Sequence, residues 1–314
     1  MEDKRFTKLK TWLTDYFDNN QYKLSIASDD ASFRRYLRVK KNNKSFIIMD
    51  APIGKEDPSK FVKIAEYLYK NNIKVPKVYA QDLKNGFLIL DDFNDTTLLS
   101  SLKEKYDINY YIDAIDNLIA IQKLPCKNNI PPYSKKLLMQ EMQLFIDWYL
   151  AKNLKTKLNN SQQKKINNLF LYLTDNALKQ KQVFVHKDYH SRNLMLLKNN
   201  NLGILDFQDA VIGPVSYDLV SLLKDAYFKI NKTDLIYLLK YYYNNSDLNI
   251  DYDDFIKQFD LMGLQRFIKI LGIFSRLYFR DGKEQYLADI PLVKYYISAV
   301  IDKYQQTSIL KDFI

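Results

Sequence analysis

Polar side chains of the kinds used in phosphoryl transfer gather in one short stretch of the sequence, residues 183–210, which reads VFVHKDYHSRNLMLLKNNNLGILDFQDA. Asp188 stands near its start, Asn193 follows five residues later, and Asp206 comes thirteen residues after that, directly before a phenylalanine. A carboxylate at a loop orients an acceptor hydroxyl, while an amide oxygen and a second carboxylate are ligands that suit Mg²⁺. These residue types in this order therefore favour metal-assisted phosphoryl transfer.

The spacing H-x-D-x-x-x-x-N, followed by D-F, matches the catalytic loop and the metal-binding aspartate of kinases. The chain has two histidines, His186 and His190, and both lie inside this motif. A plain hairpin with polar residues at its turn is the alternative, but it leaves four matched positions unexplained. We therefore predict that Asp188 is the catalytic base and that Asn193 and Asp206 bind the metal. His186 is expected to brace the loop.

The elements that must position this motif are indicated by the pattern of apolar residues. Strands are predicted over residues 22–27, 33–40, 45–50, 77–81 and 86–91, which are short and rich in aromatic and β-branched residues. Helical spacing predicts a helix over 5–18, Asp57-Pro58 begins a second helix, and the chain is mostly helical beyond about residue 96, apart from 183–206. This order predicts an α+β, two-lobed protein-kinase-like fold. The N-lobe, residues 1–92, would cover ATP, and the C-lobe, residues 93–314, would hold the catalytic loop, the metal site and the acceptor site.

The predicted N-lobe has no glycine-rich phosphate loop, because no glycine precedes residue 54. The turn between the first two strands, residues 27–35, reads ASDDASFRR. We expect its small residues and backbone amides, Ser32 among them, to cradle phosphate with help from Arg34 or Arg35. A P-loop kinase is excluded, because G-x-x-x-x-G-K-[ST] does not occur. The predicted hinge, whose backbone would meet adenine, consists of Leu90, Asp91 and Asp92.

The third strand, 45-SFIIMDAP-52, lacks the lysine that pairs with phosphate in kinases. Met49 or Asp50 stands near its place. Glu66, on the helix that follows, would then lack its lysine partner. The cation that takes over this role is left open among Arg34, Arg35 and Arg38.

Composition and charge exclude several other classes of protein. The 314 residues are 47% hydrophobic and 27% charged, which rules out a disordered chain or a glycine-rich fibre. One cysteine, Cys126, and two histidines rule out an internal disulfide and a Cys₂His₂ zinc site. No apolar run of signal-peptide or membrane-spanning length appears, so a cytoplasmic protein without a membrane partner is expected. The formal net charge is +10, but the lysines are scattered, which favours a small anionic ligand over nucleic acid.

The acceptor is predicted to be a small molecule, because the sequence has no A-P-E and no room for a peptide-docking segment after Asp206. The chain resembles the aminoglycoside phosphotransferase and choline kinase-like superfamily in the segments HKDYHSRN, LDFQD and GPVSYDL. The two-lobe order extends this resemblance over nearly the whole chain. No obligate protein partner is inferred.

A narrower resemblance is to the bacterial cell-wall sugar kinases, which phosphorylate the anomeric hydroxyl of N-acetylmuramate and N-acetylglucosamine in peptidoglycan recycling. It rests on residues 28–39, 49–52, 189–195, 206–223 and 264–283. The MDAP strand is familiar from that family, so the missing lysine looks like a family feature. The resemblance implies ATP and Mg²⁺ as cofactors, Asp188 as the base, and Asn193 and Asp206 as metal ligands. It also implies that Asp209 lies near the acceptor.

A basic stripe in residues 261–283 independently suggests an anionic acceptor. At about 100° per residue, its four members fall within an arc of about 80°: Arg266, Lys269, Arg276 and Arg280. Arginine grips a carboxylate with two hydrogen bonds, which suits a sugar that carries a lactyl group. The alternative is a solvated helix face. We predict Arg266, Arg276 and Arg280 as substrate contacts. His190 and Tyr189 are predicted to join them, unless Tyr189 instead braces the loop.

Two other functions are left open. One keeps the chemistry but gives the chain an aminoglycoside or a choline-like amino alcohol as acceptor. The other is a nucleotide-binding pseudokinase, which the missing strand lysine and glycine-rich loop would suit. The complete set of Asp188, Asn193 and Asp206 argues against a pseudokinase.

Overall fold

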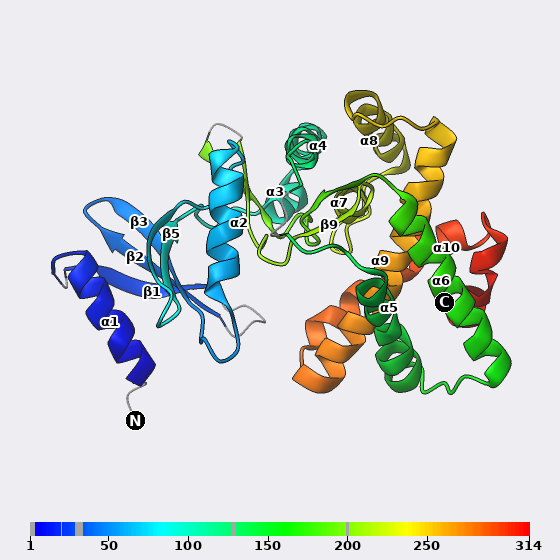
Figure 1. The fold of residues 1–314 in the computed structure, drawn as a ribbon, viewed down its shortest axis with the longest axis horizontal. Coiled ribbons are helices and arrows are strands. Elements are labelled where there is room, and N and C mark those ends of the chain that lie inside the picture. The colour runs from blue at the N-terminus through cyan, green and yellow to red at the C-terminus, as the bar shows by residue number, and fades with distance from the viewer. Residues whose placement is uncertain (1–3, 20, 29–33, 127–129, 199–200) are drawn as a thin grey trace. The chain divides into compact units, whose positions relative to one another are not determined.

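The computed structural model describes residues 4–19, 21–28, 34–126, 130–198 and 201–314. These form two compact units, Met1–Thr96 with Met195–Gln208, and Thr97–Leu194 with Asp209–Ile314. The first unit is built on a β-sheet and the second is mostly helical, so the predicted two-lobed kinase-like fold is confirmed (Figure 1). The segment Met195–Gln208 belongs to the first unit although it lies far along the chain, so the two units are not two continuous stretches. The domain boundary between residues 92 and 93 stays a prediction.

A five-stranded sheet forms the first unit, in the order β1-β2-β3-β5-β4, and neighbouring strands run antiparallel. The elements that the sequence predicted there are all present. They are α1 (Lys4–Tyr16), β1 (Lys23–Ser28), β2 (Arg35–Lys41), β3 (Lys44–Asp50), α2 (Pro58–Lys70), β4 (Val78–Asp82) and β5 (Phe87–Asp91). The predicted strand 33–40 begins on residue 33, which lies outside the described residues.

The two faces of this sheet differ because successive strand residues point to opposite sides. Alternate apolar residues of β2, β3 and β5 pack against α1 on one face of the sheet. The strands contribute Leu37, Val39, Ile48, Phe87 and Ile89, and α1 with the residue after it contributes Leu9, Leu13 and Phe17. Figure 1 shows α2 on the other side of the sheet. It begins after Asp57, whose side chain accepts a hydrogen bond from the backbone N–H of Ser59 at 3.0 Å, with Pro58 in the first turn.

The hairpin of β7 (Leu194–Leu196) and β8 (Leu202–Ile204) places Asp206 in the first unit. Its backbone bonds to that unit twice, from Leu196 N–H to Thr96 O at 2.9 Å and from Ile204 N–H to Lys74 O at 2.8 Å. Between them, Gly203 lies so close to the ring of Phe93 that an added Cβ would stand 2.5 Å from it. Only a residue without a side chain fits there, so the hairpin can approach closely.

A long buried helix, α9 (Tyr252–Asp281), forms the centre of the second unit and contacts most of its neighbours. The other helices are α3 (Leu98–Glu104), α4 (Asn109–Gln122), α5 (Lys135–Leu144), η1 (Phe145–Asn153), α6 (Asn160–Lys179), α7 (Tyr217–Leu223), α8 (Lys232–Asn245), η3 (Glu284–Asp289), α10 (Ile290–Ile301) and η4 (Gln305–Asp312). Two strands, β6 (Gln182–Val185) and β9 (Val211–Pro214), pair antiparallel. None of the helices in the described part of the chain is long and apolar enough to cross a membrane.

Two local features of this unit were not predicted. The strand β9 extends the non-helical stretch to residue 214, beyond the predicted limit of 206. It is four residues long and ends in Gly-Pro, which leaves too little periodicity for a pattern to detect. The segment η1 is a π-helix that continues α5, a local variant that hydrophobic spacing does not distinguish from an α-helix.

Candidate active site

The catalytic loop follows β6, and its entry is held by a buried aspartate that the sequence analysis did not single out. Asp218, in the first turn of α7, accepts hydrogen bonds from the backbone N–H groups of His186 at 2.6 Å and Lys187 at 3.0 Å, one on each carboxylate oxygen. Lys187 has a φ of 77°, a left-handed conformation that side chains disfavour. The two bonds hold this conformation, and the N–H of Asp188 donates to Nδ1 of His186 at 3.2 Å. His186 thus braces the loop.

The exit of the loop is held in the same way. The carboxylate of Asp225 accepts hydrogen bonds from both the backbone N–H and the hydroxyl of Ser191. The amide nitrogen of Asn193 donates to the backbone carbonyl of Asp188 at 3.0 Å. An amide that donates through its nitrogen presents its oxygen on the opposite side, and that oxygen is the atom a metal would use.

Cations from α9 set the charge around Asp188. Burial alone would raise the pKa of Asp188, but attraction to Lys269, with smaller contributions from His190, Arg266 and His186, outweighs burial and holds that pKa below its ordinary value. Lys269 is itself held at 3.3 Å from Glu141 and donates to the hydroxyl of Tyr217 at 3.0 Å. Asp188 is therefore a carboxylate that stays ionised at neutral pH.

Arg266 is buried, with 4% of its surface exposed, and only part of its guanidinium is satisfied. One nitrogen, Nη2, donates to the hydroxyl of Ser221, while Nε and Nη1 have no hydrogen-bond partner among the described residues. His190 is similar, because its Nδ1 is also buried there without a partner and burial lowers the pKa of its ring. Unpaired buried donors are costly, so these two side chains are suited to bind a ligand.

The other predicted acceptor residues are more exposed or bound within the protein, although Nε of Arg276 is also buried without a hydrogen-bond partner among the described residues. Arg280 is exposed and forms two hydrogen bonds with Asp281, and Arg276 is half-buried. Asp209 is exposed. Tyr189 is fully buried and donates its hydroxyl to the carbonyl of Ala114 at 2.8 Å, so it braces the loop and has no surface for a sugar. The predicted stripe is thus a solvated face only near its end, because α9 is a central helix.

In the first unit, Asp206 has a φ of 63° and its carboxylate accepts a hydrogen bond from the amide nitrogen of Gln208 at 2.6 Å. The predicted phosphate contact Ser32 lies outside the described residues. Arg34 forms an ion pair with Glu56 at 2.8 Å. Arg35 instead binds the buried carboxylate of Asp50 at 2.6 Å.

The predicted hinge, Leu90 to Asp92, starts in β5 and ends at Asp92, which forms an ion pair with Arg38. Leu90 is buried in β5, and the carboxylate of Asp91 accepts from the Tyr79 hydroxyl at 2.6 Å and from the Lys77 N–H at 3.1 Å. Asp92 is bound by Arg38 through two nitrogens, at 2.6 and 3.1 Å. Its side-chain carboxylate is therefore engaged within the protein, which leaves the hinge backbone as the part that would meet adenine.

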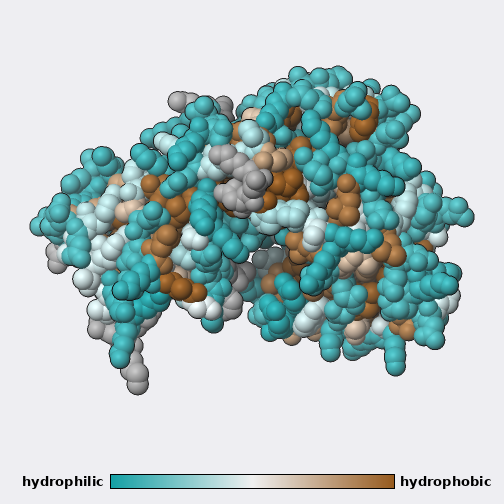
Figure 2. Space-filling model, viewed as in Figure 1, coloured by the Kyte–Doolittle hydropathy of each residue, from teal (hydrophilic) through white to brown (hydrophobic). Residues whose placement is uncertain are grey.

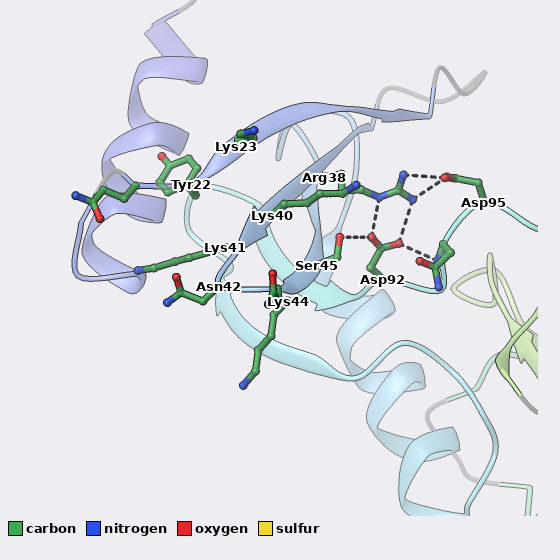
Figure 3. Close-up of a pocket in the computed structure, with 13 residues that line it drawn as sticks. Tyr22, Lys23, Arg38, Lys40, Lys41, Asn42, Lys44, Ser45, Asp92 and Asp95 are labelled. Atoms are coloured by element: carbon green, nitrogen blue, oxygen red, sulfur yellow. Dashed lines mark hydrogen bonds and ion pairs between the residues drawn. The ribbon is translucent and has the colours of Figure 1, made fainter.

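A pocket of about 790 Å³ opens beside Asp92, on the side of the β2–β3 turn (Figure 3). Its charged lining residues are Lys23, Arg38, Lys40, Lys41, Lys44, Asp92 and Asp95. Figure 3 shows Arg38 reaching between the two acids, so this arginine is engaged by carboxylates within the pocket wall.

The residues predicted to bind metal have the right chemistry for Mg²⁺. No group of three or more His, Cys, Asp or Glu side chains suited to a metal occurs among the described residues. Mg²⁺ in kinases needs only one or two protein oxygens, because phosphates and water complete its octahedron. The carboxylate of Asp206 and the amide oxygen of Asn193 fit that requirement.

Four residues of the site escaped the sequence analysis as functional residues: Glu141, Asp218, Asp225 and Lys269. Asp218 did leave a signal, since it is the lone acid in the apolar run YDLVSLL, where an unpaired carboxylate would be costly. Lys269 was noticed only as part of the stripe. Glu141 and Asp225 lie in segments whose composition gives no such signal.

Comparison with known proteins shows the family of this chain. Residues 23–249 match the family model described as the phosphotransferase enzyme family. The chain belongs to this family. Among its relatives is the N-acetylmuramate/N-acetylglucosamine kinase of Pseudomonas aeruginosa, 39% identical, with 96% of this chain and 93% of that protein covered. The protein of the same name from Neisseria meningitidis serogroup B is 34% identical over the same shares. The predicted phosphotransferase and its resemblance to cell-wall sugar kinases are thus confirmed.

Several solved structures share the fold of this chain at low sequence identity. An ethanolamine kinase of Plasmodium vivax has a TM-score of 0.68 at 13% identity, covering 90% of this chain and 85% of the other. Choline kinase LicA from Streptococcus pneumoniae has a TM-score of 0.66 at 14% identity, covering 92% and 99%. An ADP-bound aminoglycoside phosphotransferase has a TM-score of 0.63 at 17% identity, covering 94% and 97%. At these identities the likeness concerns the fold alone, so it does not favour an amino alcohol or an aminoglycoside as acceptor.

Proposed function

We propose that this chain is an ATP-dependent kinase that phosphorylates the anomeric hydroxyl of N-acetylmuramate and N-acetylglucosamine, giving 1-phosphates in the recycling of cell-wall sugars. The observation that carries the proposal is the 34% and 39% identity to kinases of that name over more than nine-tenths of both chains. Because ATP is the phosphoryl donor, the reaction is placed in the cytoplasm.

Asp188 is the residue that acts on the acceptor. Its pKa lies below the ordinary value, so at neutral pH the carboxylate accepts a hydrogen bond from the anomeric hydroxyl. The oxygen–phosphorus bond then forms while the bond between the γ-phosphorus and the oxygen of the leaving ADP breaks, and the hydroxyl proton passes to Asp188. A carboxylate of low pKa is a weak base, so it mainly orients the hydroxyl and takes the proton late, as a loose transition state permits.

Asn193 and Asp206 are assigned to the metal. Mg²⁺ held by their oxygens would neutralise the charge that develops on the β- and γ-phosphates. Gln208 donates to Asp206 at 2.6 Å and so fixes the orientation of its carboxylate. The bond from Asn193 to the Asp188 carbonyl couples the proposed metal ligand to the loop that carries the base.

The acceptor contacts are assigned first to Arg266 and His190, whose buried nitrogens lack partners among the described residues. A guanidinium with Nε and Nη1 available is suited to the lactyl carboxylate of N-acetylmuramate. Asp209, Arg276 and Arg280 stay predicted contacts.

The test is ADP release from Mg·ATP with N-acetylmuramate, N-acetylglucosamine, kanamycin, choline and ethanolamine. Asp188→Asn would be assayed beside Asp175→Asn, which changes an exposed aspartate on α6 paired only with Lys135 in the ion pairs of the described residues. We expect turnover of the two N-acetyl sugars alone, a loss of about 10²–10⁴-fold in Asp188→Asn and none in Asp175→Asn. Phosphorus NMR and the loss of reducing-sugar reactivity would identify the 1-phosphate. Turnover of kanamycin or an amino alcohol alone would overturn the acceptor, and ATP binding without any turnover would favour the pseudokinase.

A further inference from the structure

In β3, Met49 and Asp50 stand near the position where kinases have the lysine that binds phosphate. Asp50 holds α1 on the sheet instead. Asp50, at the end of β3, is fully buried and lies on the same sheet face as Ile48, which packs with α1. Arg5 of α1 donates to it at 2.7 Å, and Arg35 of β2 binds it at 2.9 and 2.6 Å. Arg35 therefore joins an ionic cluster that fastens α1 to the sheet.

Arg38 is committed as well. Its guanidinium binds the carboxylate of Asp92 at 2.6 and 3.1 Å and that of Asp95 at 2.7 and 3.0 Å, as Figure 3 shows. Four charge-assisted hydrogen bonds to two acids leave little positive charge for a phosphate. Of the three arginines left open by the sequence, two are thus bound to acids other than Asp206.

Arg34 differs, because it lies beside the proposed metal ligand. One of its nitrogens, Nη2, contacts Glu56 at 2.8 Å, and the other, Nη1, stands 4.0 Å from the carboxylate of Asp206. The side chains of Arg34 and Glu56 are only 11% and 21% exposed. In protein kinases the strand lysine likewise pairs with a glutamate next to the metal-binding aspartate.

Like that glutamate, Glu56 is the acid that pairs with the cation. It lies before the first residue of α2, however, and not on the helix. The glutamate on α2, Glu66, is about half exposed and its ion pair is with Lys70, one turn along the same helix. The ion pair of Glu66 is therefore formed within its own helix.

We infer that Arg34 is the cation that binds the terminal phosphates of the nucleotide in place of the strand lysine, with Glu56 as the residue that positions it. The inference rests on the proposed function only in that the ligand is a nucleoside triphosphate. A guanidinium carries five N–H donors, so it keeps its contact with Glu56 while it binds phosphate oxygens. An arginine also presents a planar fork that matches phosphate better than a lysine does.

The experiment measures nucleotide binding by calorimetry without any sugar, with Mg·ATP and AMP as the ligands. Arg34→Met removes the charge and keeps the bulk, and Arg34→Lys keeps the charge. We expect Arg34→Met to weaken Mg·ATP binding at least tenfold and AMP binding less than twofold, with partial recovery in Arg34→Lys. Arg35→Met is the comparison, and it should lower the melting temperature by removing one of the two arginines that bind the buried Asp50, while Mg·ATP still binds.

Glu56→Gln tests the positioning role against Glu66→Gln on the neighbouring helix. Glu56→Gln should lower kcat and weaken Mg·ATP binding less than Arg34→Met does, and in the Arg34→Met background it should have little further effect. Glu66→Gln should change neither quantity. Mg·ATP affinity and kcat unchanged in Arg34→Met, or equal loss for Mg·ATP and AMP, would overturn the inference. Binding of Mg·ATP and AMP is measured without an acceptor. The binding result can therefore be interpreted even if the proposed sugar specificity is wrong.

Discussion

Single residues near Asp188 determine the charge of the site. Lys269 and Arg266 come from one helix, and both are buried, yet they differ in how far their hydrogen bonds are satisfied. Lys269 has Glu141 and Tyr217 as partners, so it stabilises the ionised loop. Arg266 has one partner and two nitrogens without any among the described residues. The physical difference is that Arg266 has two buried nitrogens that can gain hydrogen bonds when an anion enters.

Arg266→Gln is therefore expected to raise KM for N-acetylmuramate more than for N-acetylglucosamine. A hydrogen bond to a charged group contributes about 1.5–3 kcal/mol, which corresponds to roughly 10- to 100-fold in KM. Steady-state kinetics with both sugars at saturating Mg·ATP measure the ratio. Lys257→Gln, an exposed change on the same helix, is the control. An equal loss for both sugars would mean that Arg266 serves Asp188 alone.

At the scale of elements, the catalytic loop takes its shape from α7. Asp218 is buried at the start of this helix and accepts both backbone N–H groups of the loop entry. Burial raises the pKa of Asp218 to about 7, although the two donated hydrogen bonds oppose the rise. The folded protein therefore binds a proton there that the unfolded chain has already released.

The sign of the resulting pH dependence follows from linkage. Between the ordinary aspartate pKa of about 4 and the folded pKa of about 7, the folded state binds more protons, so the contribution of Asp218 to stability falls as pH rises. Urea unfolding at pH 5 and pH 8 measures it. In Asp218→Asn this decline should be smaller, and the loss of an acceptor should cost about 1–3 kcal/mol at pH 5. A decline as steep as that of the unmodified protein would contradict the assignment.

The hairpin of β7 and β8, which carries Asp206, packs closely against Phe93 at Gly203. Gly203→Ala would place a methyl group 2.5 Å from the ring of Phe93, so the hairpin must shift, at a cost of about 1–3 kcal/mol. We expect weaker Mg²⁺-dependent ATP binding together with lower stability, seen by calorimetry and thermal unfolding. Gly54→Ala is the matched control, because nothing lies within 4 Å of an added Cβ there. Unchanged binding in Gly203→Ala would separate the hairpin from the metal site.

At the scale of the whole molecule, the formal net charge of +10 acts over the surface rather than at one residue. Figure 2 shows mostly hydrophilic residues on the visible face, with apolar ones in scattered patches. Such a field attracts an anionic sugar toward the protein but has little effect on a neutral one.

Added salt should therefore raise KM for N-acetylmuramate by about two- to fivefold between 50 and 500 mM NaCl, because screening shortens the reach of the field. KM for N-acetylglucosamine, measured at saturating Mg·ATP, should stay nearly constant. Only the ratio of the two is informative, since ATP is anionic in both assays. Parallel changes for both sugars would show that salt acts through ATP or the fold.

The sequence by itself determined the order of the chemical groups and the class of fold. Residues within one loop or one strand keep their spacing when the chain folds. The motif from His186 to Asp206 and the strands of the sheet could therefore be predicted from the sequence. The burial of the basic residues of α9 could not be predicted from the sequence. Helical spacing shows which residues share a face, but not whether that face is exposed to water or packed in the core.

Only the tertiary structure decided which side chains partner the motif. Asp218 meets His186 across 32 positions of the chain, and Arg34 meets Glu56 across 22. Contacts of this kind depend on how strands and helices are packed, and no spacing in the sequence encodes them. Three arginines near the start of β2 were equivalent in the sequence, and they became distinct only when the fold gave two of them acidic partners other than Asp206.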